Sequence, residues 1–431
     1  MTPKKNYRVV ALISFLLFFV ISALASGSRA EASPVYGLED CLEIAGQNHP
    51  DIAGAEASVA SSKGRLALSA AADRLTVDGS VSASRSGSRM NESSSYSIGA
   101  TAGVKLYDAN RNKYTLDASR ATLSATESEA LYTLSGVRAN VKSAYLAILL
   151  DYEIERQRAD SVRAFEQHLE QARGFYEAGS KPWYDVTKAE VDLGNAQMSL
   201  VEASANVQNA HAALANAMGV DPSEDFGVAR PGLDILSVPD EAVSEAEALA
   251  MENRPDYAAA ALKVEAGKST LSAEARSDSP TISLSGGYSG SADDSFDFER
   301  GWNTGLKMSI PIADGGASAS RTDIARAQVS SLESSREKLR QGILLDVSRA
   351  KSDIIKARER IRISGITLKN AEENRKLAEG RYETGVGDAM EVTDALLSYT
   401  AAILASKQAQ YDLQIAIVNL ERAVGLEFGL N

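Results

Sequence analysis

The apolar residues between about Asp314 and Gly385 recur on alternating steps of three and four, with steps of seven where a polar residue interrupts the line. They are Ile343, Val347, Ala350, Ile354, Ala357, Ile361, Leu368, Ala371, Ala378 and Tyr382. This heptad seam predicts helices packed side by side as coiled coils. No proline lies between Pro50 and Pro182 or after Pro311, so both stretches lack the strongest helix breaker. A helix of about 65 to 70 residues is a rod of roughly 100 Å, longer than a globular domain needs.

Four short segments, 74–84, 96–107, 281–290 and 302–312, alternate between apolar and small polar residues and predict strands. The expected apolar faces carry Tyr96, Ile98, Ala100, Ala102, Val104 and Leu106 in the second segment, and Trp302, Leu306, Met308, Ile310 and Ile312 in the fourth. The polar stretches 85–95 and 291–300 predict hairpin tips. Such a sheet could divide lipid from an aqueous lumen. It could also belong to a soluble sandwich, since alternation alone fits both.

The chain carries this series of elements twice. The stretch "FYEAGSKPWYDVTKA" at 175–189 returns as "RYETGVGDAMEVTDA" at 381–395, a shift of 206 residues. The same shift relates Leu106, Asp108, Asp117, Arg120, Ala121, Ala217 and Gly219 to Ile312, Asp314, Asp323, Arg326, Ala327, Ala423 and Gly425. "NHPDI" and "NRPDY", near the start of each half, are related by a shift one residue smaller, so one residue is inserted between the early and late landmarks. We expect homologous repeats at 33–220 and 241–431 with a linker at 221–240. Each would hold a medium helix, two strands, a very long helix, a turn and a further helix.

Residues 1–25 have the pattern of a secretory signal peptide. Basic residues precede an apolar run that ends in Ala23 and Ala25, small residues placed for cleavage, and a second possible site follows Ala32. The run is shorter than the roughly 20 residues that a membrane-spanning helix needs. The sequence therefore predicts an exported chain.

The number of expected strands restricts how this chain could form a barrel. Closing a barrel around a lumen takes about eight strands. Four strands left open in lipid would expose backbone groups at a cost of several kcal/mol each. If the sheet lies in a membrane, the chain must therefore pool its strands with further copies of itself.

Charge argues against nucleic acid as a partner, because 58 acidic residues outnumber 45 basic ones and no dense Lys/Arg cluster is present. The one cysteine, Cys41, permits neither an intramolecular disulfide nor a Cys-based zinc site. We expect it to be a buried helix residue. The residues "LED" before it also differ from a lipid-attachment signal.

No catalytic pattern is present, so we expect no enzyme, no cofactor and no metal site. His49, His168 and His211 are scattered without ligand spacing, and His49 fits a helix boundary before Pro50. No Gly-x-Ser-x-Gly elbow occurs, and "GVGDAM" lacks the third glycine of a nucleotide-binding loop.

Several motifs together resemble the TolC-type outer membrane efflux proteins, over nearly the whole mature chain. They are "LEDCLEIAGQNHPDI", "AEALAMENRPDY", "LYDANRNKYTLDASRA", "IPIADGGASASRTDIARA" and the "YEAG" and "YETG" turns. The resemblance implies a mixed fold with two homologous repeats per chain: a homotrimeric duct with a pooled 12-stranded β-barrel in outer membrane lipid and a long periplasmic α-helical coiled-coil barrel. It further implies a passive exit duct of a tripartite efflux or type I secretion system, with a periplasmic adaptor (membrane fusion protein) and an inner membrane transporter as partners.

The resemblance also assigns residues at the periplasmic mouth. Glu391 and Asp394 match positions that ring its constriction, and their i, i+3 spacing places them on one helix face. Three copies would bring six carboxylates around a narrow bore, which attracts cations. By themselves the same two residues also fit solvated charges in a first helical turn, where the helix dipole favours them.

Tyr382 and Asp185 match a pair that ties the inner and outer coils within one subunit. Gly387 departs from the pattern, because well-studied members carry there an arginine that braces the closed mouth. Lys181 and Lys188 are the basic residues that could replace this brace.

A second class of protein also fits part of the sequence. A soluble periplasmic coiled-coil adaptor, or a structural protein, would share the signal peptide and the heptads. It would lack paired amphipathic strands with hairpin tips in both halves. Dependence on detergent for extraction distinguishes the two.

Overall fold

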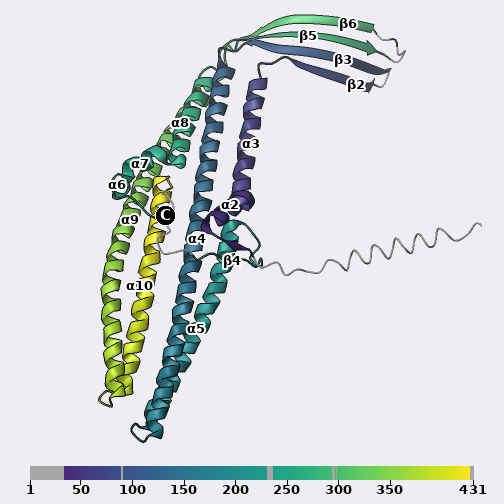
Figure 1. Ribbon diagram of the computed structural model, residues 1–431. Helices are drawn as coiled ribbons and strands as arrows, with labels where there is room; N and C mark the ends of the chain where they lie inside the picture. The colour runs from purple at the N-terminus through teal and green to yellow at the C-terminus, as the bar shows by residue number, and fades with distance from the viewer. Residues whose placement is uncertain (1–33, 89–90, 231–235, 294–296, 298, 428–431) are drawn as a thin grey trace, which may run out of the picture.

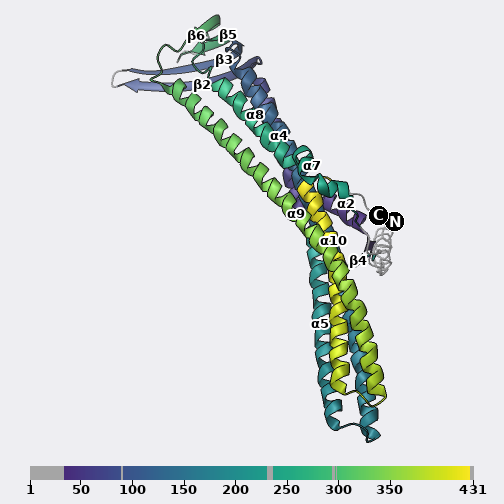
Figure 2. The ribbon, with the colours of Figure 1, turned by 90° about the vertical axis from the view of Figure 1, so that its left-hand side faces the viewer.

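The computed structural model describes residues 34–88, 91–230, 236–293, 297 and 299–427. The signal peptide expected at 1–25 lies outside these residues. Figures 1 and 2 show long helices along a common direction, a sheet at one end and two helical turns at the other.

The described elements form two copies of one series. In the first copy they are α2 (Leu38–Asn48), α3 (Pro50–Ala71), β2 (Thr76–Ser88), β3 (Asn91–Tyr107), α4 (Arg111–Glu177) and α5 (Trp183–Met218). In the second they are α7 (Ala246–Asn253), α8 (Pro255–Glu274), β5 (Thr281–Ala292), β6 (Glu299–Ser309), α9 (Ala317–Glu383) and α10 (Ala389–Val424). The short elements β1 (Val35–Tyr36), β4 (Gly227–Val228) and α6 (Asp240–Ser244) lie outside the series. The expected repeat is therefore confirmed.

Helices α9 and α10 begin and end 206 residues after α4 and α5, whereas β5 begins 205 residues after β2. The inserted residue inferred from the sequence therefore lies between Thr281 and Asp314.

The two long helices, α4 and α9, have 67 residues each, which corresponds to a length of about 100 Å. Toward the far end from the sheet, α4 packs on α5 and α9 packs on α10; toward the sheet, α3 and α8 take their places (Figure 2). Most residues of the predicted seam of α9 are buried, and Ile361, Leu368 and Ala371 are half-buried. The coiled-coil prediction is confirmed.

A glycine at the end of each shorter helix explains two of the repeated landmarks. Gly219 and Gly425 adopt positive φ angles of 73° and 78° as C-caps of α5 and α10. An added Cβ at Gly219 would lie 2.7 Å from the Cα of His49, and one at Gly425 would lie 3.0 Å from the Cα of Arg254. The "NHPDI" and "NRPDY" motifs are thus the partners of these caps. His49 is the N-cap of α3, as expected for a helix boundary.

The turn between the last strand and the long helix also has the same shape in both repeats. Ala109 and Asn110 have positive φ angles of 57° and 64°, and Gly315 and Gly316 take the equivalent positions with 67° and 88°. For a residue that carries a Cβ, the left-handed backbone conformation is less favourable in free energy than it is for glycine. The first repeat therefore holds this turn at a conformational cost.

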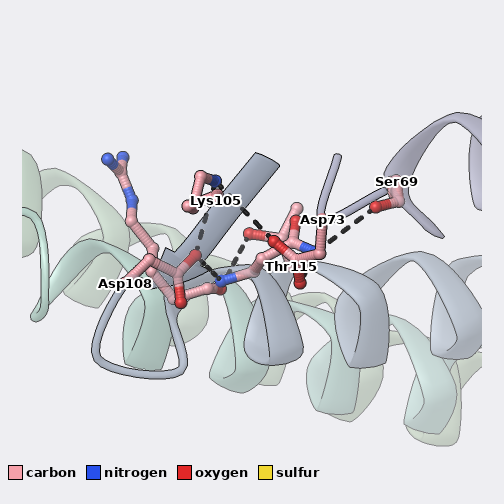
Figure 3. A network of polar contacts seen from close by, with 7 residues as sticks. Ser69, Asp73, Lys105, Asp108 and Thr115 are labelled. Carbon is pink, nitrogen blue, oxygen red and sulfur yellow. Dashed lines mark hydrogen bonds and ion pairs between the residues drawn. The ribbon is translucent and has the colours of Figure 1, made fainter. Parts of the chain in front are cut away.

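A polar network joins sheet to helices at the first of these turns (Figure 3). The Asn112 amide donates to a carboxylate oxygen of Asp73 at 2.6 Å, and its backbone N–H donates to Asp108 at 3.0 Å. Lys105, near the end of β3, lies 3.5 Å from Asp108 and 3.9 Å from Asp73. The ends of α3, β3 and α4 are thereby fixed to one another.

The four long strands form one antiparallel sheet in the order β2-β3-β5-β6, so the two repeats pair through β3 and β5. The register aligns Val81, Ile98, Gly290 and Arg300 in one row, and Gly79, Ala100, Tyr288 and Trp302 in the next row of the same face. The opposite face carries mainly serine, glycine and threonine along all four strands. The predicted division into an apolar and a small polar face is confirmed.

Two expectations about the strands were wrong in extent. The prediction placed Ile310 and Ile312 in the last strand, but β6 ends at Ser309, and Ile312 is 96% exposed. Pro311 lacks the N–H that a ladder needs, and Ser309 already pairs with Thr281, the first residue of β5. The strands also continue into both expected hairpin tips: β2 and β3 pair up to Ser88 and Asn91 inside 85–95, and β5 and β6 pair up to Ser291 and Glu299 inside 291–300. Backbone pairing needs no apolar side chains, so it extends past the end of the apolar alternation.

The largest apolar core lies about halfway along the molecule, between α2, α4, α5, β4 and α10. Cys41 is fully buried there, and burial raises the pKa of its thiol to about 12, which makes it unreactive. Lys142 of α4 and Glu421 of α10 form a buried ion pair at 2.7 Å across the same region. Within the described ranges, no helix has the length and apolar character to span a membrane.

Candidate functional site

The two turns far from the sheet meet each other. The α4–α5 turn covers 178–182 and the α9–α10 turn covers 384–388, and the second residue of each is a glycine of positive φ, Gly179 or Gly385. The Lys181 ammonium donates a 2.8 Å hydrogen bond to the carbonyl of Gly387. Of the two lysines considered as braces, Lys181 therefore joins the hairpins, and Lys188 pairs with Asp192 on its own helix.

Tyr382, on the seam of α9, is fully buried at this contact. Phe175 meets its ring edge-on at 5.3 Å between centroids, the His168 ring lies at 5.5 Å, and the Lys181 ammonium lies 5.1 Å from the ring centre. These contacts place residues of α4 and its turn around a residue of α9. Tyr382 thus packs the first hairpin against the second.

Asp185, in the first turn of α5, is 7% exposed and lies near Tyr382. Burial, and to a smaller degree the negative charge of Asp185, raises the pKa of Tyr382 to about 12. The phenol oxygen has no hydrogen-bond partner among the described residues. The structure therefore brings the two residues of the expected tie together without a hydrogen bond between them.

A hydrogen bond between the coils lies two helical turns further along. Thr393 of α10 donates to the Asp192 carboxylate of α5 at 3.0 Å, and both residues are buried. Lys188 pairs with the other oxygen of the same carboxylate. This buried carboxylate has a partner at each oxygen, as a buried charge requires.

Glu391 and Asp394 are both exposed, three residues apart in the first turns of α10. Their surroundings differ. Arg381 of α9 lies 3.1 Å from the Glu391 carboxylate, whereas Asp394 has no ion pair with any described residue. Asp388 caps the helix by accepting the Glu391 N–H at 2.8 Å. The positive charge of Arg381 therefore partly offsets the negative charge of Glu391, whereas the charge of Asp394 faces solvent.

Gly387 fits tightly between these groups. A Cβ at this position would lie 3.0 Å from a carboxylate oxygen of Glu391 and 3.1 Å from both the Arg381 side chain and the Tyr382 nitrogen. An arginine at Gly387 would thus compete for the space that Arg381 and Glu391 occupy.

Three residues of this region were absent from the sequence prediction in these roles. His168 was assigned no role, although it is buried and neither ring nitrogen has a hydrogen-bond partner among the described residues. Burial is the main cause that lowers the pKa of His168. Arg381 and Thr393 were missed because their partners are brought close only by tertiary packing. Arg381 directly precedes Tyr382 in the repeated motif, which was the only available signal.

No group of three or more His, Cys, Asp or Glu residues suited to a metal ion occurs in the part of the chain that the structure describes. Direct contacts at the turns are instead packing, ion pairs and hydrogen bonds between two hairpins. The arrangement can hold two helical hairpins together and can display carboxylates at their tips.

Comparison with known proteins gives consistent results. OprJ of Pseudomonas aeruginosa is 28% identical over 354 residues, which cover 79% of this chain and 72% of that protein. TolC of Vibrio cholerae is 22% identical over 427 residues, 95% of each chain. The structure of VceC from Vibrio cholerae has a TM-score of 0.80 at 18% identity, covering 91% of this chain and 97% of that one, which shows the same fold. The model of the family described as outer membrane efflux protein matches residues 41–220 and 248–426, and the chain belongs to this family.

Proposed function

We propose that this protein is a passive exit duct of the outer membrane, conducting cargo across the outer membrane and periplasm. One observation carries the proposal: a sheet with an apolar and a small polar face is attached to helices of about 100 Å, in a member of this family. The apolar face suits lipid and the polar face suits an aqueous lumen. The helices are long enough to carry that lumen well beyond the membrane.

The duct would be a homotrimer. The sheet order leaves β2 and β6 as edge strands, and among the described residues neither has a partner strand on its outer side. Pairing β6 of one copy with β2 of the next would build a 12-stranded barrel and supply the missing backbone partners. Exposed apolar residues on α5 and α9, among them Met198, Val201, Ile355 and Ile363, are available for contacts between copies.

The hairpin tips would form the periplasmic mouth. In a trimer, Asp394 and Glu391 would contribute six carboxylates around the bore, three of them shared with Arg381. The contacts of Lys181 and of Asp192 with Thr393 would hold the inner and outer coils together, and Tyr382 and Asp185 would pack between them. The mouth would then favour cations and open when these contacts break.

The duct would work with a periplasmic adaptor and an inner membrane transporter, and the transporter would supply the energy and select the cargo. The family is one of channels, and we assign the chain no catalytic role and no cofactor. The alternative of a soluble periplasmic adaptor is disfavoured by the exposed apolar face, where Val81, Trp302 and Leu306 are 80%, 77% and 68% exposed. A soluble protein rarely leaves so much contiguous apolar surface in water.

Fractionation and reconstitution test the proposal. The mature chain should require detergent for extraction from outer membranes, should have the mass of three copies in mild detergent, and should form cation-selective pores in planar bilayers. Extraction by salt or carbonate alone, or a stable monomer with full β content and no conductance, would overturn the duct.

A further inference from the structure

A groove of ≈ 660 Å³ lies on the sheet, mainly along its apolar face, a volume in the range of pockets that hold small ligands. Its floor contains Gly79, Ala100 and Gly290, and Val81, Ile98 and Tyr288 rise around it. Arg300 stands at one end. The groove is thus apolar along most of its length and cationic at one end.

The strand register explains why the face is hollow here. Gly290 lies between Ile98 and Arg300 in one row, and Gly79 and Ala100 lie beside Tyr288 in the next. The small residues Gly290, Ala100 and Gly79 thus follow one another across β5, β3 and β2, and larger side chains lie on both sides of them. A Cβ at Gly79 would meet no atom within 4 Å, so the depression is open at that end.

Arg300 is the unusual member of this face. It forms no ion pair or hydrogen bond with any residue that the structure describes, and its neighbours in the two rows are glycine, isoleucine and tryptophan. An unpaired arginine on a lipid-facing wall costs about 2 to 4 kcal/mol at mid-bilayer and little near the interface. Tyr288 and Trp302, paired across β5 and β6, are the residue types that mark this interface. We therefore expect the guanidinium to lie at the level of the lipid headgroups, where it can bind an anion.

We propose that the groove binds one anionic membrane lipid, with its phosphate at Arg300 and an acyl chain along Gly290, Ala100 and Gly79. This proposal rests on the proposed function only for the placement of the sheet in a bilayer. Charge complementarity at Arg300 favours an anionic lipid over a zwitterionic one. A cargo molecule is disfavoured, because cargo would pass along the opposite, polar face.

Tryptophan fluorescence can report the site, because the chain has two tryptophans, Trp183 and Trp302. Trp302 lies two residues from Arg300 on the same face, and Trp183 lies at the far hairpin tip. In a Trp183→Phe background, purified trimer is reconstituted into vesicles containing brominated phosphatidylglycerol or brominated phosphatidylcholine. Quenching of Trp302 should show a roughly fivefold lower half-saturating fraction for phosphatidylglycerol, the effect of one basic residue at an anionic headgroup.

Two variants test the two halves of the site. Arg300→Gln should remove the preference for phosphatidylglycerol while both lipids still quench Trp302. Ala100→Leu fills the floor and should weaken the preference with Arg300 intact. Lys307→Gln, a charge change on the polar face of the same strand, should leave the preference unchanged.

Equal quenching by the two lipids in the Trp183→Phe background, or an unchanged preference after Arg300→Gln is added to it, would overturn the lipid site while leaving the duct intact. Absence of quenching by either lipid would show that the face is not in the bilayer, and would overturn the lipid site and the proposed function together.

Discussion

Lys181 and Gly387 hold equivalent positions in the two repeats, 206 residues apart, and the Lys181 ammonium donates a 2.8 Å hydrogen bond to the Gly387 carbonyl. The chain thus uses the internal duplication to bond one copy of its turn to the other. The same lysine lies over the ring of Tyr382. A single side chain therefore contacts both the turn and the last seam residue of the second hairpin.

Replacing this lysine should loosen the mouth. Lys181→Met keeps much of the apolar stem but loses a charged hydrogen bond, an interaction of about 1.5 to 3 kcal/mol. Single-channel conductance should rise and open events should lengthen. Lys369→Met, an exposed position on α9, is the control and should behave as the unsubstituted protein. Unchanged gating in Lys181→Met would remove this contact from the closure.

Two hydroxyl groups between the coils, those of Thr393 and Tyr382, should differ in how much stability is lost when each is removed. Thr393→Val removes a partner of the buried Asp192 carboxylate and should cost about 1 to 3 kcal/mol of stability in denaturant titrations. Tyr382→Phe removes a hydroxyl that has no described partner and should be nearly neutral. A large loss in Tyr382→Phe would indicate a direct bond to Asp185 in the assembled protein.

The tip carboxylates should contribute unequally to ion selectivity. Asp394→Asn should reduce cation preference in bilayers more than Glu391→Gln, because Arg381 already offsets the Glu391 charge. Arg381→Gln should increase cation preference, and the double variant Glu391→Ala with Asp394→Ala should shift the pore toward anions. Glu359→Gln, which lies far along α9, serves as the charge-matched control. Selectivity that follows none of these changes would mean that the carboxylates do not line the bore.

Acid should weaken the contact between the hairpins through His168. Burial lowers the pKa of His168, although Asp192 and Asp185 oppose this and Lys188 adds to it. The unfolded imidazole therefore takes up a proton at a higher pH than the folded one, and the folded state loses relative stability as pH falls below about 6.5. Above that pH both states are neutral at this residue and no effect is expected.

This linkage can be measured as the thermal midpoint of the purified protein between pH 7.5 and 5.5. His168→Phe should flatten the decline, and His211→Phe should keep it. A decline that persists unchanged in His168→Phe would assign it to other groups.

The glycine caps should tolerate no side chain. Gly219→Ala forces a Cβ to within 2.7 Å of the His49 Cα at a φ of 73°, and should cost at least about 1 to 2 kcal/mol. Gly46→Ala, in the interior of α2 with nothing within 4 Å of the added atom, should instead stabilise by up to about 1 kcal/mol. Equilibrium unfolding of the two variants gives the comparison, and equal effects would contradict the packing at the cap.

Periodic elements were predictable from the sequence because helix and strand periods depend on local residues alone. The seam of α9, the faces of β3 and the repeat were all available in this way. The end of β6 was missed because the apolar alternation continues to Ile312, although Pro311 was a local signal against pairing there and Ser309 pairs with the first residue of β5. At the tips, the bond between Asp192 and Thr393 joins residues 201 positions apart, so no local pattern could reveal it.

Because β2 and β6 are edge strands of the described sheet, folding should depend on the concentration of newly exported chains. If only neighbouring copies can complete the sheet, the native barrel has no stable form at low chain concentration, and its apparent stability rises with the amount of protein made. Edge strands that remain unpaired can also pair with strands of other proteins and lead to aggregation. The rate of export into the periplasm would then decide between assembly and aggregation, with no change in the sequence.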